Sequence, residues 1–102
     1  MIELIKTNLA IVEGLCQRYK VLRLEVFGSA ASENWDPAHS DLDFLVQFAP
    51  CEPRLHYDRY FGLLEGLQTV FARPVDLVEA DAMRNPYFIK SIQPSRRLLY
   101  AA

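Results

Sequence analysis

The fold is decided by two neighbouring stretches of the chain, Val26-Phe27-Gly28-Ser29 and, eleven residues further on, Asp41-Leu42-Asp43-Phe44-Leu45-Val46. Apolar residues alternate with other types over 21–27 and again over 42–46, which predicts two β-strands. Side chains in a strand repeat every two residues, so Asp41 and Asp43 should project from one face and the apolar side chains from the other.

The two aspartates indicate a metal site. Carboxylates about 7 Å apart along a strand repel each other unless a cation lies between them. A magnesium ion, or a pair of ions about 4 Å apart, fits such oxygen ligands and commonly assists phosphoryl transfer. Gly28 permits a tight turn and close approach to a ligand, and Ser29 can cap a short helix or bond a phosphate. Together these residues predict a metal and nucleotide site.

Asp76 is the candidate third carboxylate. It interrupts the apolar segment 75–78, which reads as a short strand. A lone buried carboxylate costs several kcal/mol unless it is paired or binds a metal. If this strand lies beside that of Asp43, three carboxylates share one face; taken by itself, Asp76 fits better as a solvent-facing residue at a strand end.

The remaining chain predicts helices around these strands. An apolar stripe over 2–19 indicates a helix that covers the sheet, and a second stripe over 57–71 indicates a crossover helix. Asn85 and Pro86 fit the start of a short helix that ends near Ile92. The apolar tail over 97–100 is expected to form either a short strand or a contact surface.

The loop over 30–40 should border the predicted site. Trp35 and His39 stand in it and could reach a nucleotide base or phosphate. A loop tryptophan more often packs on its own domain, and a single histidine more often has no catalytic role. We therefore favour a structural role for both.

Length, composition and net charge limit the classes of protein to which this chain can belong. The 102 residues have room for one domain, 1–102, and 51% hydrophobic with 24% charged residues predicts a folded globule. A net charge of -2 argues against an extended nucleic-acid interface. Cys16 and Cys51 lack metal-ligand spacing, so we expect reduced thiols in the cytoplasm. Neither a signal peptide nor a membrane span is expected.

An aspartate pair of this kind also occurs in sites with a different chemistry. An EF-hand calcium loop is excluded, because apolar residues follow where further oxygen ligands are required. A sugar-nucleotide transferase can also use such a pair, but binding donor and acceptor generally takes a larger chain. A solvated strand face without function stays open.

The order and spacing of these motifs resemble the signature of the polymerase-beta-type nucleotidyltransferase superfamily. The closest group is the minimal nucleotidyltransferases (MNT), antitoxins that are paired with HEPN-domain toxins in prokaryotes. The likeness rests on Gly28-Ser29, on 40–46 and on Val75-Asp76-Leu77-Val78, and it extends to the leading helix, 84–87 and 98–100. It implies an α/β (α+β) fold with a small mixed β-sheet flanked by helices.

The resemblance also implies the chemistry. Asp41 and Asp43 would hold magnesium, two ions in all, with Asp76 as the third carboxylate that helps to hold the catalytic ion and orients or deprotonates the attacking hydroxyl. Gly28 and Ser29 would hold the phosphates of ATP. The expected reaction transfers AMP from ATP to a hydroxyl, taken to be a tyrosine, of a cognate HEPN RNase toxin, and neutralises it within a hetero-oligomer.

One departure from the family pattern leaves a second function open. An arginine commonly follows the Gly-Ser pair, whereas this chain has Ala30-Ala31-Ser32. The alternative is therefore a catalytically weak or inactive MNT-fold antitoxin that masks its toxin by binding. A third interpretation, a transferase acting on a small molecule such as an aminoglycoside, usually requires a further domain.

Overall fold

The computed structural model describes residues 1–32, 34–38 and 40–102. Its elements follow one another in the order α1 (Glu3–Thr7), α2 (Leu9–Arg18), β1 (Val21–Phe27), η1 (Gly28–Ala31), β2 (Leu42–Phe48), α3 (Pro53–Phe71), β3 (Val75–Glu79), η2 (Ala80–Ala82), α4 (Pro86–Ile92), η3 (Gln93–Ser95) and β4 (Arg97–Ala101). None of the helices in this described part is long and apolar enough to cross a membrane.

The four strands form one mixed sheet in the order β3-β2-β1-β4. β1 pairs antiparallel with both β2 and β4, whereas β2 pairs parallel with β3. A parallel pair needs a crossover connection, and α3 provides it between β2 and β3. The predicted mixed sheet with flanking helices is thereby confirmed, and so is the predicted neighbourhood of the second and third strands.

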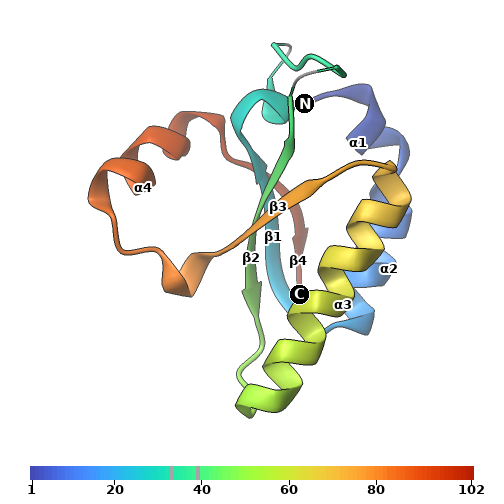
Figure 1. Cartoon of the computed structure of the whole chain (residues 1–102), viewed down its shortest axis with the longest axis vertical. Helices are drawn as coiled ribbons and strands as arrows, with labels where there is room; N and C mark the ends of the chain where they lie inside the picture. Colours follow the sequence, from blue (N-terminus) through green and yellow to red (C-terminus); the bar gives the residue numbers. More distant parts are fainter. Residues whose placement is uncertain (33, 39) are drawn as a thin grey trace.

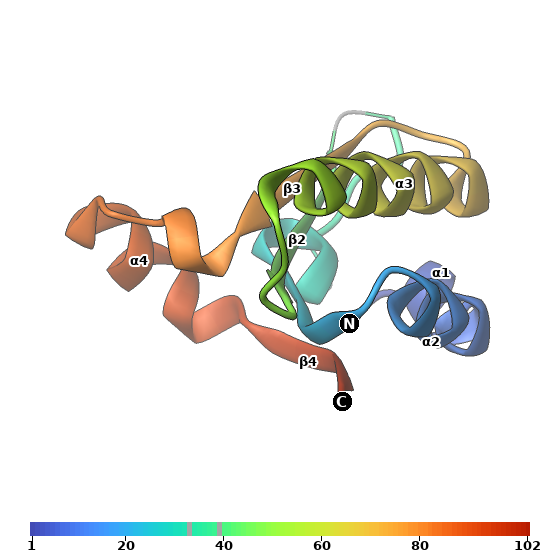
Figure 2. The same cartoon turned by 90° about the horizontal axis from the view of Figure 1, so that it is seen from below.

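Helices cover both faces of the sheet. Figures 1 and 2 show α1, α2 and α3 on one side and α4 on the other. Alternate side chains of β2 point to opposite faces of the sheet. The main core under α1–α3 contains Leu42, Phe44, Val46 and Phe48. Leu45 joins a smaller apolar cluster with Phe27 and Ile92 under α4.

The predicted single helix over 2–19 is wrong in one respect, because the chain breaks at Asn8 into α1 and α2. The Asn8 side chain donates a hydrogen bond to the Leu4 carbonyl at 2.8 Å. Its backbone angles, φ -106° and ψ 11°, lie outside the helical range. A local side-chain bond of this kind competes with the backbone hydrogen bonds of a continuous helix.

Other boundaries differ by small amounts. β2 begins at Leu42, so Asp41 precedes the strand instead of lying within it. α3 starts at Pro53, four residues before the apolar stripe, since proline is well suited to the first helical position. The short helix is confirmed as α4, with the Asn85 side chain accepting from the backbone N–H groups of Tyr87 and Phe88. The tail forms β4, which decides between its two predicted alternatives in favour of a strand.

Trp35 has the structural role that the sequence favoured. It packs against the main core, and the Arg73 guanidinium lies over its ring at 4.5 Å from the centroid. Arg73 also donates to the Pro37 carbonyl at 3.3 Å, which ties the loop to the end of α3. His39, the other loop candidate, lies outside the described residues.

Both cysteines are free, as predicted. Cys16 is buried in the main core, and this burial, followed by the nearby Glu13 carboxylate, raises the pKa of its thiol to about 12. The Cys16 thiol is therefore an inert core group at neutral pH.

The close approach of α2 to α3 requires a glycine at position 62. A Cβ added to Gly62 would lie 2.3 Å from Cε1 of Tyr19, whereas one added to Gly14 would meet no described atom within 4 Å. We expect Gly62→Ala to be less stable than Gly14→Ala by about 1–3 kcal/mol, because the Tyr19 ring must move. Gly14→Ala itself should gain roughly 0.5–1 kcal/mol by reducing backbone freedom. Equal denaturant midpoints for the two variants would show that Tyr19 moves at no cost.

Candidate functional site

The register of the two parallel strands brings two of the predicted aspartates together. Asp43 of β2 and Asp76 of β3 are direct register partners. Partners on neighbouring strands project from the same face, about 5 Å apart. Asp41 stands two residues before Asp43, directly outside β2. All three therefore lie at the end of the sheet where β2 and β3 begin.

Asp43 occupies the most desolvated position of the three. It is half-buried, whereas Asp41 and Asp76 are exposed. Its other neighbour in the sheet is Phe27, a member of the apolar cluster under α4. This burial is the main reason that the pKa of Asp43 rises from 3.8 to about 6, and repulsion from Asp76 and then Asp41 adds to it.

Asp76 is exposed, as the sequence favoured for this residue taken by itself. It lies on the edge strand β3 and projects from the face opposite to the buried Leu77. Its position opposite Asp43, and not burial, is what links it to the other aspartates.

The predicted turn lies against the Asp43 carboxylate. Gly28 directly follows Phe27, the β1 partner of Asp43, and has φ +73°. A Cβ at position 28 would approach Oδ2 of Asp43 to 2.8 Å. Both the backbone angle and the close approach therefore require glycine here. The turn and the carboxylates form one continuous surface.

Ser29 lies in η1, directly beyond this turn. Its carbonyl accepts bonds from the backbone N–H and the hydroxyl of Ser32, which fix the turn. The Ser29 hydroxyl makes no hydrogen bond to the described residues, so it can donate to a ligand.

The chemistry of the three aspartates suits a hard cation, because their donors are carboxylate oxygens. Among the described residues, no hydrogen bond or ion pair offsets their charge. Burial, followed by repulsion from Asp76 and Asp41, raises the pKa of Asp43. The side chains are not gathered into a finished ligand set, since no three acidic, histidine or cysteine groups of the described chain converge on one point. A cation there would have to draw the carboxylates together by side-chain rotation.

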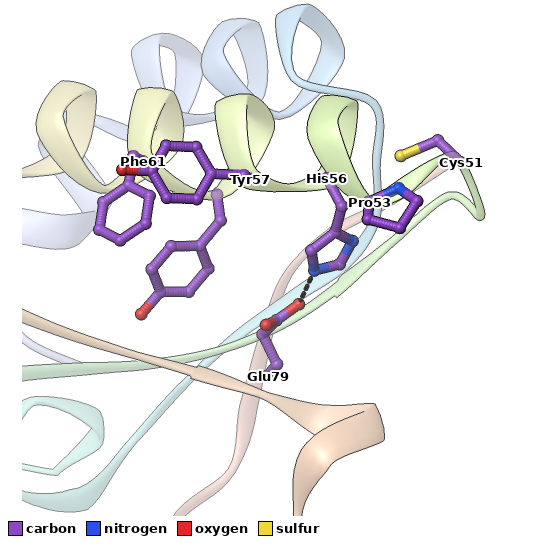
Figure 3. Close-up of a pocket in the computed structure, with 7 residues that line it drawn as sticks. Cys51, Pro53, His56, Tyr57, Phe61 and Glu79 are labelled. Carbon is purple, nitrogen blue, oxygen red and sulfur yellow. Dashed lines mark hydrogen bonds and ion pairs between the residues drawn. The ribbon is translucent and has the colours of Figure 1, made fainter.

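A second concave feature lies farther along β3. A groove of about 550 Å³ is lined by Cys51, Pro53, His56, Tyr57, Tyr60, Phe61 and Glu79. Figure 3 shows the His56 and Glu79 side chains pointing toward one another across it. Glu79 is three residues beyond Asp76, about 10 Å along the strand.

This groove is less suited to catalysis than the aspartates. The His56 ring and the Glu79 carboxylate already bond each other, and the Tyr60 hydroxyl donates to the Leu77 carbonyl at 2.6 Å. Burial, followed by Glu79 and Asp76, raises the pKa of that Tyr60 hydroxyl. These three polar side chains of the groove are thus engaged, so we assign the chemistry to the aspartates.

Sequence reasoning missed a buried ion pair beside the site. Glu25 is only 5% exposed and receives Arg96 Nε at 2.8 Å and Arg23 at 3.1 Å. The sequence did contain a signal for Glu25. It stands two residues before Phe27 in the strand, so it projects from the same face as that apolar side chain. The partner Arg96 is 71 residues away and carries no such signal.

The comparisons with known proteins agree with this geometry. A family model described as a nucleotidyltransferase domain matches residues 10–99. A protein of Methanocaldococcus jannaschii named "Putative protein adenylyltransferase MJ0128" is 38% identical over 79 residues, which cover 78% of this chain and 76% of the relative.

Solved structures extend the agreement to the fold. A structure described as a "putative minimal nucleotidyltransferase" superposes with a TM-score of 0.71 at 26% identity and covers 94% of this chain and 95% of its own. An MNT antitoxin in complex with a tri-AMPylated HEPN toxin of Shewanella oneidensis superposes with a TM-score of 0.63 at 17% identity over 95% of this chain and 72% of its own. The chain belongs to the nucleotidyltransferase domain family and has the fold of the minimal nucleotidyltransferases.

Proposed function

We propose that this protein is an antitoxin that transfers AMP from ATP to a hydroxyl, a tyrosine, of a cognate HEPN RNase toxin. The observation that carries the proposal is the register of Asp43 with Asp76 beside the Gly28 turn. Three carboxylates and a backbone turn at one strand end form a suitable site for a nucleotide triphosphate and its metal.

The donor set fits magnesium, held by Asp41, Asp43 and Asp76. When bound, magnesium neutralises the phosphate oxygens and the charge that develops on the leaving group. The rise in the pKa of Asp43 supports this assignment, because a cation removes the repulsion that causes part of it.

The chain's own groups position the reactants. The Gly28 turn allows the phosphates to approach the backbone, and the free Ser29 hydroxyl can donate to them. Asp76, the more exposed member of the register pair, faces the solvent side from which an acceptor arrives. It orients the attacking hydroxyl and takes its proton.

The bond changes balance without a further reactant. The acceptor oxygen bonds to the α-phosphorus while the bond from that phosphorus to the bridging oxygen breaks. Pyrophosphate leaves with the bonding electrons, and the hydroxyl proton passes to Asp76.

A protein acceptor is supported by the relatives. The Methanocaldococcus relative is named a protein adenylyltransferase, and the Shewanella complex joins an MNT antitoxin with an AMPylated HEPN toxin. By analogy we place the reaction in the cytoplasm, within a hetero-oligomer of the two proteins.

One observation favours the alternative, neutralisation by steric masking. Ala30 and Ala31 stand where the family commonly has arginine, and both are buried in the main core. A long cationic side chain does not fit at either position, so η1 itself supplies no cation for the triphosphate. Without that arginine, either binding alone neutralises the toxin, or the toxin supplies the positive charge that the triphosphate needs.

Labelled ATP distinguishes the two functions. We expect the protein, magnesium and its cognate HEPN toxin to yield AMP-labelled toxin, with transfer reduced at least about 100-fold in Asp41→Asn/Asp43→Asn. Asp58→Asn, which removes an exposed carboxylate of α3, is the matched control and should transfer normally. Equal labelling by the double variant would refute catalysis at these aspartates. If the double variant transfers no AMP but still protects cells fully from the toxin, the protein neutralises the toxin by masking.

The metal-free protein should also carry a pH signature of Asp43. Because folding raises the pKa of Asp43 from 3.8 to about 6, protonation stabilises the fold below pH 4, and this stabilisation is lost as the pH rises through 6. With chelator at pH 7, Asp43→Asn should be more stable than wild type by about 1 kcal/mol after allowance for solvent screening. The advantage should shrink toward pH 4, as measured by denaturant unfolding. An advantage that is independent of pH would contradict this origin.

A further inference from the structure

We propose that Ser95 is a positioning residue that holds the Gly28–Ser29 turn in place for the nucleotide phosphates. The inference rests on the proposed function and extends it to a side chain from the far end of the sequence. Ser95 is the last residue of η3, between α4 and β4.

The Ser95 hydroxyl is the link between η3 and the turn. The Gly28 backbone N–H donates to Ser95 Oγ at 2.9 Å, across 67 residues of sequence. The same Oγ donates to the Ile92 carbonyl at 3.0 Å. A hydroxyl has one proton, so its commitment to Ile92 leaves the lone pairs directed at Gly28. The bond to Gly28 is therefore oriented before any ligand arrives.

The neighbouring residue anchors this segment independently. Arg96 Nε donates to the buried Glu25 carboxylate of β1 at 2.8 Å. Ser95 and Arg96 thus attach to the end and to the middle of the same strand. Because a charge-assisted bond holds the segment, the Ser95 hydroxyl is fixed relative to β1 and hence to Asp43, which pairs with β1 at Phe27.

The position of Gly28 matters because little space separates it from the carboxylates. A Cβ at Gly28 would lie 2.8 Å from Asp43 Oδ2, so the turn can lie this close to the carboxylate only because residue 28 has no side chain. Glycine can adopt several backbone conformations besides the one seen here, with φ +73°. The bond to Ser95 favours this conformation over the others. Loss of that bond should let the turn move relative to the aspartates, and a nucleotide that contacts the turn and the metal on the aspartates would bind less well.

The test compares three variants of the full chain. Ser95→Ala removes both bonds, and Ser95→Thr keeps the hydroxyl. Ser91→Ala is the matched control, because the Ser91 hydroxyl donates to the Phe88 carbonyl at 2.8 Å in the same i to i−3 manner but does not reach the turn. The readouts are the affinity for a non-hydrolysable ATP analogue with magnesium, KM and kcat for AMP transfer, and hydrogen exchange at the Gly28 amide.

We expect Ser95→Ala to weaken nucleotide affinity and raise KM for ATP by roughly fivefold to twentyfold, with a smaller change in kcat. Gly28 amide exchange should speed up by a similar factor, Ser95→Thr should restore all of these values, and Ser91→Ala should behave as wild type.

Unchanged KM and affinity in Ser95→Ala, beside an active wild type, would overturn the inference and leave the proposed function standing. A wild type that neither binds nor transfers nucleotide would instead overturn the proposed function, and with it the phosphate role of Ser95. With such an inactive wild type, equal hydrogen exchange at the Gly28 amide in wild type and Ser95→Ala would also refute the positioning role of Ser95.

Discussion

The parallel pairing of β2 with β3 is the constraint on which the site depends. Its register sets Asp43 opposite Asp76, and a slip by one residue would turn one of them to the other face. α3 makes the parallel connection possible, and the main core fixes its register by burying Leu42, Phe44 and Val46 on the opposite face. The helices of one layer thus determine where the carboxylates of the other face lie.

The two faces of the sheet have different roles. The α1–α3 side holds most of the apolar core, while the α4 side holds a smaller cluster that ends at Phe27, beside Asp43. This cluster desolvates the Asp43 carboxylate enough to raise its pKa without sealing it from a ligand. The same side carries the Glu25–Arg96 pair and the Ser95 bond, so the return of the chain through α4 and η3 supports the turn.

The sequence was informative where the pattern is local. Alternation predicted β1 over 21–27 without error, and Asn85-Pro86 predicted the start of α4. It failed at Asn8, where a local side-chain bond to the Leu4 carbonyl breaks the first helix although the apolar stripe continues. The candidate aspartates were found through spacing, but the exposure of Asp76 depends on β3 being an edge strand. The bonds of Ser95 to Gly28 and of Arg96 to Glu25 span 67 and 71 residues and produce no periodic pattern in the sequence.

The most direct test of the central claim is a titration of isotope-labelled protein with Mn²⁺, which binds the same oxygen ligands as magnesium and broadens nearby NMR signals. If Asp41, Asp43 and Asp76 form one metal site beside the turn, the amides of 41–43, 76 and 28 should broaden first, and Asp41→Asn/Asp43→Asn should abolish the effect. Broadening that begins around Glu79 and Cys51, or that is spread evenly over the chain, would contradict the account.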